Sequence, residues 1–368
     1  MTGRRVLIAA GGTGGHVFPA LAVAQSLRHQ GWHAEWVGSD RGLEARVIPA
    51  AGFGLHILKF SGVRGRGLMA LLSLPFRLIS ALARAMAITM RARPEVVVAF
   101  GGYVTFPIGL IAWLRRIPLC VHEQNAVMGT ANRWLARIAR SVMISFPGTR
   151  FAPVRAILVG NPVRDAIMAL PEPLIRYGQR TGPLRVLVVG GSLGASSLNT
   201  SVPQALRMAT DAGAFWEIRH QTGVAALSQV QSDYATRGLA ATCDAFIDDM
   251  TAAYQWADLL ICRAGASTVT EVAAVGVAAI FVPLPSAIDD HQTANARALS
   301  ESGAAWTLPQ SDTLARQLAD ILTSVTRDTL CARAARAREL ATPEATQRVV
   351  ATVRLAVTGE PVSSGARA

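Results

Sequence analysis

The chain has 368 residues, more than one hydrophobic core usually serves, so we expect two domains. Its formal net charge is +12, which favours an anionic partner such as nucleic acid, anionic lipid or a phosphorylated substrate. Lys59 is the only lysine, which nearly excludes Schiff-base and P-loop lysine chemistry, and the four cysteines form no C-x-x-C pair, which argues against a disulfide framework or a zinc site.

The first predicted element is the strand "RVLIAA", which runs into the glycine-rich stretch "GGTGGH" and then a helical pattern. A strand that turns on glycines into a helix presents backbone N–H groups that favour an anion, usually phosphate. The turn is not a P-loop, because it has no lysine, and it is not a complete dinucleotide fingerprint, because Val17 occupies the third glycine position. The turn ends instead in His16.

A basic, apolar segment follows over residues 67–93, interrupted by charges that rule out an uncharged membrane span. Three arginines recur every seventh residue, and apolar residues lie between them: Arg77, Arg84, Arg91, and Leu78, Ile79, Leu82, Met86 and Met90. Lys59, Arg64 and Arg66 precede the segment. The pattern is typical of a helix in a membrane interface over anionic headgroups. The alternative is an ordinary amphipathic helix packed on a sheet with its arginines outward.

An internal repeat indicates the architecture. The stretch "LIAAGGTGGH" (7–16) aligns with "VLVVGGSLGA" (186–195), so that Gly-Gly-Thr and Gly-Gly-Ser follow equivalent strands. Continuous apolar strands separated by helices predict parallel sheets covered on both faces. We therefore expect an α/β protein with two doubly wound domains facing a cleft, joined by a linker within residues 160–185.

Two further motifs in the second half are ambiguous by themselves. The stretch "RAGASTVTE" places Thr268 and Glu271 as a capping box, which is as plausible as a ligand-binding role. The pairs Asp248–Asp249 and Asp289–Asp290 lack the D-x-D spacing expected of metal-dependent transferases, and we interpret them as solvated or hydrogen-bonded loop acids.

Collinear motifs now identify a family. They are "GGTGGHVFPALAVA", "SGVRGRG", "GGYVTFP", "HEQNAVMGTANRWLA", "GNPVR", "VVGGSLGASSLN", "FIDDM", "ADLLICRAGASTVTE" and "VPLPSAIDDHQTANA". From about Arg4 to about Val357 the chain resembles the bacterial N-acetylglucosaminyltransferases that convert lipid I to lipid II in peptidoglycan synthesis. Departures from the family pattern are small, at Glu95, Phe100 and Leu193.

The resemblance implies the GT-B glycosyltransferase fold. It implies an acceptor- and membrane-binding domain over 1–163, a donor domain over 164–341, and a helix at 342–357 that packs back on the first domain; residues 358–368 read as a disordered tail. The expected reaction is inverting transfer from UDP-N-acetylglucosamine to the C4 hydroxyl of the undecaprenyl-diphosphate-linked muramoyl-pentapeptide. Expected partners are anionic inner-leaflet lipids and other cell-wall synthesis and division proteins, with no nucleic acid, at the cytoplasmic face of the inner membrane. We expect no cofactor and no obligatory metal.

The resemblance also implies roles for particular residues. His16 is the expected catalytic base and Glu123 its rival, with His122 orienting the loop of Glu123. Contacts to the donor, the diphosphate or the transferred sugar are expected from Thr13, Gly14, Gly15, Asn125, Arg164, Ser192, Ile247, Ala266, Ser267, Thr268, Glu271 and Gln292. Among these, Ser192 would donate to the diphosphate, Glu271 would hold the ribose hydroxyls and the backbone of Ile247 would contact uracil.

Three alternatives remain open from the sequence. A UDP-N-acetylglucosamine 2-epimerase would share the fold and the donor but not the motifs. A nicotinamide-dependent oxidoreductase would use Asp40 as its ribose-binding acid, although the incomplete fingerprint counts against it. A basic membrane-associated scaffold would leave both glycine turns unexplained.

Overall fold

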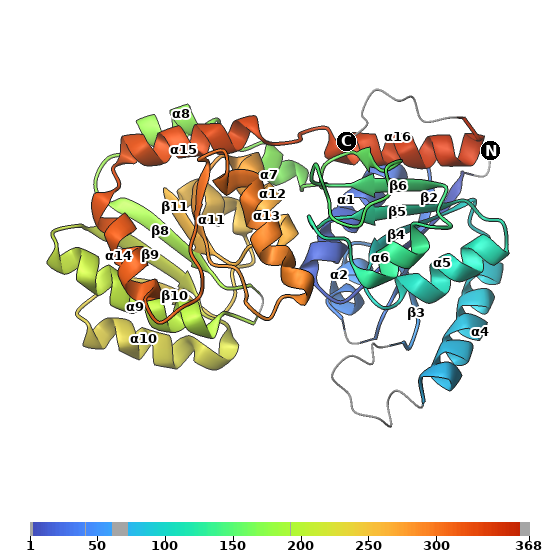
Figure 1. Cartoon of the computed structure of the whole chain (residues 1–368), viewed down its shortest axis with the longest axis horizontal. Coiled ribbons are helices and arrows are strands. Elements are labelled where there is room, and N and C mark those ends of the chain that lie inside the picture. The colour runs from blue at the N-terminus through green and yellow to red at the C-terminus, as the bar shows by residue number, and fades with distance from the viewer. Residues whose placement is uncertain (1–2, 41, 61–72, 192, 361–368) are drawn as a thin grey trace. The chain divides into compact units, whose positions relative to one another are not determined.

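The computed structural model describes residues 3–40, 42–60, 73–191 and 193–360. The chain forms two compact units, Met1–Arg164 together with Thr342–Ala368, and Asp165–Ala341 (Figure 1). The division falls after Arg164, one residue later than the boundary expected from the sequence.

The first unit contains a seven-stranded parallel sheet in the order β3-β2-β1-β4-β5-β6-β7. Its strands are β1 (Arg5–Ala10), β2 (His33–Gly38), β3 (Gly54–Ile57), β4 (Val96–Gly101), β5 (Leu119–Glu123), β6 (Ser141–Ile144) and β7 (Ile157–Leu158). The inner strands β4, β5 and β6 are buried along their whole length, as continuous apolar runs require. Strand order reverses between β1 and β4, the point at which such sheets bind ligands.

Helices cover both faces of this sheet. Val6 and Ile8 face the core formed with α1 (Gly14–His29), α2 (Glu44–Ala50) and α16 (Ala345–Thr358). Leu7 and Ala9 face the opposite core, formed with α4 (Leu74–Ala92), α5 (Thr105–Leu114) and α6 (Thr130–Leu135). Figure 1 shows α16 along one side of the first unit and α4 beside α5 on the other. The C-terminal helix thus packs on the first unit, whereas residues 361–368 of the expected tail lie outside the described residues.

The second unit contains a six-stranded parallel sheet in the order β10-β9-β8-β11-β12-β13. Its strands are β8 (Leu184–Val189), β9 (Trp216–Gln221), β10 (Ala241–Asp244), β11 (Leu259–Cys262), β12 (Ala278–Phe281) and β13 (Ala305–Thr307). The helices are α7 (Asp165–Met168), α8 (Pro173–Gly178), α9 (Ser196–Asp211), α10 (Leu227–Thr236), α11 (Met250–Trp256), α12 (Ala266–Val275), α13 (His291–Ser300), α14 (Leu314–Ser324) and α15 (Arg327–Glu339).

The two sheets repeat one strand order, with the first strand of each unit beside its second and fourth. The glycine turns repeat as well, because Gly12 and Gly191 adopt φ angles of 94° and 92°. Few residues other than glycine tolerate these angles. The predicted pair of doubly wound parallel sheets is therefore confirmed.

Residues 74–92 of the basic segment form helix α4, whose inner face packs on the sheet as the alternative predicted. Residues 67–72 of the segment, and Arg64 and Arg66 before it, lie outside the described residues. Ala81, Ala85, Thr89 and Ala92 are buried there. Leu82 and Met86, expected at a membrane surface, pack instead against the core. Among the described residues no helix is both long and apolar enough to span a bilayer.

Candidate active site

The loops after β1 and β4 meet at the point where the strand order of the first sheet reverses. The amide of Gly11 donates to the carbonyl of Gly101 over 3.3 Å. Gly102 has a φ of 92°, and a Cβ there would lie 2.4 Å from the carbonyl oxygen of Gly11. Only glycine allows this backbone approach, so the motif "GGYVTFP" holds the first glycine turn in place.

His16 lies in the first turn of α1, with its ring against the same loop. A Cβ on Gly101 would come within 2.8 Å of His16 Nε2, so the imidazole packs directly over this glycine. Thr13 is the exposed N-cap of α1, and Gly14 and Gly15 begin the helix. The four residues that the sequence predicts around the first turn thus lie at the start of α1.

Glu123, the rival base, is buried at the end of β5. One carboxylate oxygen accepts hydrogen bonds from the amide and side chain of Asn125, at 3.0 and 3.1 Å. The other accepts from the Gly129 amide at 3.0 Å and from Asn132 Nδ2 at 2.9 Å. Four donors therefore engage this carboxylate, and they order the loop that contains Asn125.

His122 is completely buried and holds the same region together. Gln124 Nε2 lies 2.9 Å from Nδ1 of His122. Nε2 of His122 lies 3.0 Å from the carbonyl oxygen of Gly160. Nε2–H therefore donates to Gly160, and the ring is neutral. Burial lowers the pKa of His122 to about 4, partly opposed by the hydrogen bond to Gly160.

A second buried histidine, His220 on β9, connects three elements of the second unit. Tyr234 Oη lies 2.9 Å from Nδ1 of His220, and Asn199 Oδ1 lies 3.1 Å from Nε2 of His220. Asn199 Nδ2 donates in turn to the carbonyl of Thr222 at 2.9 Å. Burial lowers the pKa of His220 to about 4.

These two histidines predict how stability depends on pH. Their folded pKa values of about 4 lie below the ordinary value of 6.5, so the unfolded chain binds more protons between these limits. The free energy of unfolding should fall as pH drops from about 6.5 to about 4, by about 1.4 kcal/mol per pH unit for each proton. Urea unfolding at pH 7, 6 and 5 measures the slope.

His220→Gln should reduce the slope of unfolding free energy against pH by the contribution of about one proton. His29→Gln, a change at an exposed histidine, should leave the slope unchanged. Equal slopes for His220→Gln and the parent would contradict this assignment.

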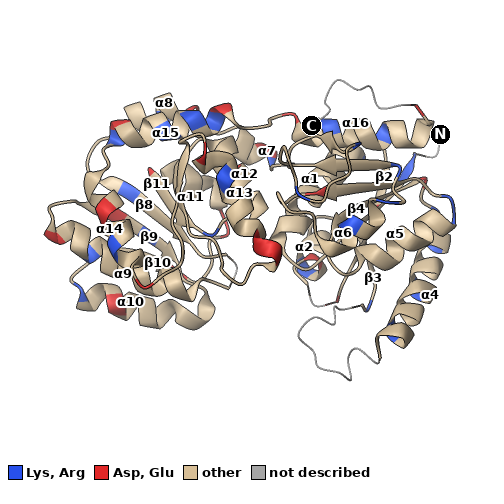
Figure 2. Cartoon of the chain, viewed as in Figure 1, with Lys and Arg blue, Asp and Glu red and all other residues tan. Residues whose placement is uncertain are grey.

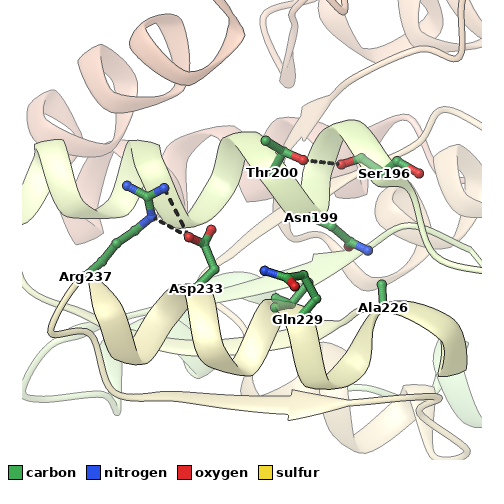
Figure 3. Close-up of a pocket in the computed structure, with 8 residues that line it drawn as sticks. Ser196, Asn199, Thr200, Ala226, Gln229, Asp233 and Arg237 are labelled. Atoms are coloured by element: carbon green, nitrogen blue, oxygen red, sulfur yellow. Dashed lines mark hydrogen bonds and ion pairs between the residues drawn. The ribbon is translucent and has the colours of Figure 1, made fainter.

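A polar hollow lies near this network, between α9 and α10 (Figure 3). On its walls Asp233 pairs with Arg237, and Thr200 donates to the carbonyl of Ser196. It contains none of the site residues predicted from the sequence, and its charged groups neutralise each other.

The second glycine turn follows β8, where strand order reverses in the second sheet. The amide of Gly194 donates to the carbonyl of Gly191 at 2.9 Å. A Cβ on Gly194 would lie only 1.9 Å from the carbonyl oxygen of Thr222, so the turn crosses the end of β9 in close contact. Gln221 Nε2 also donates to the Gly191 carbonyl at 3.1 Å. Ser192, the predicted diphosphate ligand, lies outside the described residues.

Helix α12 begins earlier than a capping box would require. Gly265 is its N-cap, and no side chain caps the helix. Ala266, Ser267 and Thr268 are therefore the first three helical residues, and the capping-box interpretation is wrong. Glu271 lies in the second turn.

The carboxylate of Glu271 accepts a hydrogen bond from the Tyr254 hydroxyl at 2.9 Å. Tyr254 comes from α11 and is buried. Because Tyr254 lies 17 residues from Glu271, no local motif pairs the two. Tyr254 is thus a partner of a predicted site residue that the sequence analysis missed.

The remaining predicted donor ligands lie on separate segments. Gln292 Oε1 accepts a hydrogen bond from the backbone amide of Leu284 at 2.9 Å, so the Nε2 group of Gln292 is the part of this side chain that can donate to a ligand. Ile247 is buried between β10 and α11. In the first unit, the guanidinium of Arg164 lies 5.4 Å from the ring centre of Phe18.

Arg263, directly after β11, is a second residue that the sequence analysis missed. Its guanidinium donates to the carbonyls of Val282 and Pro283, to Ser197 Oγ and to Gln310 Oε1. None of these partners among the described residues is a carboxylate, so the positive charge has no neutralising anion there. Burial lowers the pKa of Arg263. A basic residue immediately after the buried strand "LLIC" is the signal that could have identified it.

The aspartate pairs belong to helix starts. Asp249 accepts from the Ala252 amide at 3.0 Å and caps α11. Asp290 precedes α13 and accepts from Thr293 Oγ1 at 2.7 Å. Both residues are thus hydrogen-bonded acids, as predicted.

Comparison with known proteins identifies the family. Residues 6–144 match the glycosyltransferase family 28 N-terminal domain, and residues 185–349 match the family 28 C-terminal domain. A protein of Bordetella parapertussis named UDP-N-acetylglucosamine--N-acetylmuramyl-(pentapeptide) pyrophosphoryl-undecaprenol N-acetylglucosamine transferase is 55% identical over 95% of this chain and 97% of its own length. The protein of that name from Ralstonia nicotianae is 51% identical over 94% of each chain.

Two solved structures resemble this chain. The crystal structure of Acinetobacter baumannii MurG has a TM-score of 0.81 and 41% identity, and it covers 95% of this chain and 99% of its own. An S. aureus MnaA–UDP structure, with a TM-score of 0.67, 11% identity and coverage of 98% and 100%, shares the fold alone. The chain therefore belongs to glycosyltransferase family 28 and, within it, to the UDP-N-acetylglucosamine--N-acetylmuramyl-(pentapeptide) pyrophosphoryl-undecaprenol N-acetylglucosamine transferases.

Proposed function

We propose that the protein transfers N-acetylglucosamine from UDP-N-acetylglucosamine to the C4 hydroxyl of undecaprenyl-diphosphate-MurNAc-pentapeptide, inverting the anomeric centre and giving lipid II. The observation that carries this proposal is the 55% identity to a transferase of this name over nearly the full length of both chains. The repeated glycine turns and the first three residues of α12 supply the backbone donors that a diphosphate substrate needs.

The reaction requires a base for the acceptor hydroxyl, and His16 is our choice. Its ring lies beside the first glycine turn, where a ligand is expected beyond the carboxyl ends of the strands. Glu123 is less suited, because four hydrogen bonds engage its carboxylate in ordering a loop. His16 would take the hydroxyl proton as the C4 oxygen attacks the anomeric carbon and the bond to UDP breaks.

The donor side must stabilise the departing diphosphate, and we propose that it does so without a metal. Helix starts place backbone N–H groups and a positive dipole end at α9 and α12. Arg263 adds a guanidinium beside Ser197 on α9, with no described carboxylate to neutralise it. These groups would take the role that a cation has in metal-dependent transferases.

Chelation tests the proposal of metal independence. Activity in excess EDTA should remain within about twofold of the untreated enzyme, since preorganised donors stabilise the leaving diphosphate. The measurement is initial rate after dialysis against EDTA, with added magnesium as the control. Complete loss of activity that magnesium or manganese restores would contradict it.

The reaction itself is tested by product release. Purified enzyme should release UDP from UDP-N-acetylglucosamine only when the lipid-linked muramoyl-pentapeptide is present, and UDP rather than NAD should raise its melting temperature. UDP release without acceptor, accompanied by epimerised sugar, would support the 2-epimerase alternative. Stabilisation by NAD would support the oxidoreductase alternative, although its expected ribose ligand Asp40 is exposed.

The acceptor's polyprenyl chain requires a membrane surface, and we propose that helix α4 contributes it. Phe76, Ile79 and Met90 are 77%, 65% and 58% exposed, whereas Ala81, Ala85, Thr89 and Ala92 on the inner face of the helix are buried. Figure 2 shows basic residues and no acidic ones on α4. Exposed aromatic and aliphatic side chains beside arginines suit an interface with anionic lipid. The protein would then be peripheral at the cytoplasmic face of the inner membrane, near other cell-wall synthesis and division proteins.

Changing Arg77, Arg84 and Arg91 together to Gln should weaken binding to anionic vesicles by about 10²-fold at low salt. The estimate takes about 1 kcal/mol for each basic side chain near the surface. Vesicle co-sedimentation measures binding, and salt should reduce the difference. Transfer to the natural acceptor should slow, whereas transfer to a short-chain soluble acceptor should barely change.

The matched control changes three arginines of the second unit, Arg207, Arg316 and Arg336, to Gln. It loses the same charge and should keep its vesicle affinity. If both triple variants bind vesicles equally, the arginines of α4 do not contact lipid.

A further inference from the structure

A completely buried carboxylate, Glu44, lies under the first glycine turn. Its Oε2 accepts a hydrogen bond from the amide of Gly12 at 3.0 Å. Its Oε1 accepts two, from the amide of Ser39 at 2.8 Å and the hydroxyl of Ser39 at 2.7 Å. Glu44 begins α2, which follows β2, so its side chain joins the loop after β2 to the turn after β1.

Glycines surround this carboxylate. A Cβ on Gly11, Gly38 or Gly42 would lie 2.6, 2.5 or 2.1 Å from atoms of the Glu44 side chain. The backbone of both loops therefore approaches the carboxylate at distances that no other residue type permits. The three glycines form a close-fitting enclosure for this side chain.

Burying a carboxylate is unfavourable unless hydrogen bonds or charges compensate it. No lysine, arginine or histidine among the described residues pairs with Glu44, and its three donors all come from the two loops. An apolar side chain could fill the same space in the core without this penalty. The carboxylate is thus suited to holding loop amides, not to filling the core.

Among the described residues, Glu44 supplies the side-chain hydrogen bond at the tip of this turn. Gly12 is exposed, has a φ of 94°, and has nothing within 4 Å of the position of an added Cβ. The contacts of Gly11 with Gly101 and Gly102 fix one side of the turn, and the bond from Gly12 to Glu44 fixes the other. Thr13 to His16 follow immediately, so their positions depend on both attachments.

The repeated turn of the second unit is held differently. There the neutral amide of Gln221, at the end of β9, donates to the carbonyl of Gly191. In the first unit a carboxylate accepts from the amide of Gly12. Among the described residues, a carboxylate thus holds the turn that carries His16 and a neutral amide holds the repeated turn.

We propose that Glu44 is a positioning residue for the transfer reaction. It fixes the first glycine turn and thereby keeps the start of α1 and the His16 imidazole in place relative to the acceptor. This inference rests on the proposed function, because it assigns the acceptor hydroxyl and its diphosphate to the first turn. Glu44 itself touches no substrate.

Glu44→Gln tests the proposal, because one end of the new amide must place its NH₂ group against a loop donor. In the full-length enzyme kcat/KM for the lipid-linked acceptor should fall by about 10²-fold, the order expected when reacting groups shift by about 1 Å. The dissociation constant for UDP, measured by calorimetry, should stay within about twofold. Glu35→Gln, a carboxylate change on β2 that bonds only to His33 and His56 among the described residues, is the matched control and should leave both values unchanged.

A double variant separates positioning from general destabilisation. If Glu44 acts through the turn that carries His16, then adding Glu44→Gln to His16→Ala should lower the rate by less than about threefold. Multiplicative losses in the double variant would overturn the proposal, as would an unchanged acceptor kcat/KM in folded Glu44→Gln.

A milder variant covers the case in which Glu44→Gln does not fold. Ser39→Ala removes one of the three donors and should lower acceptor kcat/KM several-fold without changing UDP affinity. Equal acceptor kinetics in Ser39→Ala and the parent would then overturn the proposal. Failure of the proposed function is distinct, since the parent enzyme would then form no product in the same assay.

Discussion

His16→Ala should lower turnover by about 10²–10⁴-fold while UDP affinity is retained, because a general base contributes that range and the substitution leaves the second unit intact. The His16 ring packs over Gly101 beside the first glycine turn. Substitution by alanine removes this imidazole and adds no atoms that could block the acceptor. Steady-state kinetics with the lipid-linked acceptor measures turnover, and calorimetry measures UDP binding. His33→Ala, at an exposed histidine of the same unit, is the control.

The pH–rate profile tests the assignment independently. If His16 is the base, the acidic limb of the profile should disappear in His16→Ala. Neither His122 nor His220 can produce that limb, because burial lowers both pKa values to about 4. An acidic limb that persists in His16→Ala would identify Glu123 as the base, and Glu123→Gln should then lose it.

Glu271→Ala should weaken UDP-N-acetylglucosamine binding by about 1–3 kcal/mol, a factor of about 5–150, because it removes the acceptor for the ribose hydroxyls and for the hydrogen bond from Tyr254. Donor affinity is measured by calorimetry. The control, Glu217→Ala, removes a carboxylate of the same unit that lies on the surface with Arg185, and it should bind the donor normally.

Tyr254→Phe extends this test. It removes only the hydroxyl that orients the Glu271 carboxylate and should weaken donor binding by a smaller factor in the same direction. With a 2′,3′-dideoxyribose donor analogue, both substitutions should lose most of their effect. If Glu271→Ala binds the natural donor as tightly as the parent, the carboxylate does not contact ribose.

The sequence by itself determined the fold class and the family. Continuous apolar strands such as "EVVVAF" can be buried on both faces only in a parallel sheet covered by helices, so they predict the architecture without knowledge of contacts. The repeated Gly-Gly turns required two equivalent strand–turn–helix units, which the φ angles of Gly12 and Gly191 reproduce. Collinear motifs over nearly the full length then identified the family.

Local patterns were less reliable at helix ends and faces. The spacing of Thr268 and Glu271 matches a capping box, but α12 begins at Ala266 because Gly265 takes the extended cap conformation. On α4 the apolar residues Leu82 and Met86 pack against the core, and Phe76, which the pattern did not select, is the most exposed of its large apolar side chains. Periodicity places residues on a helix, but the neighbouring helix α5 decides which face is covered.

Only the tertiary structure decided how the site is supported. Glu44 lies 32 residues from Gly12, Arg263 lies 66 from Ser197, and Tyr254 lies 17 from Glu271. The first two pairs meet because parallel strands bring the ends of β1 and β2, and of β8 and β11, to one edge of each sheet. The third pair joins two helices, α11 and α12. A buried carboxylate such as Glu44 is recognised by its donors and by the glycines around it, which come from loops distant in sequence. The sequence records which residues can bond, whereas strand order determines which of them come within bonding distance.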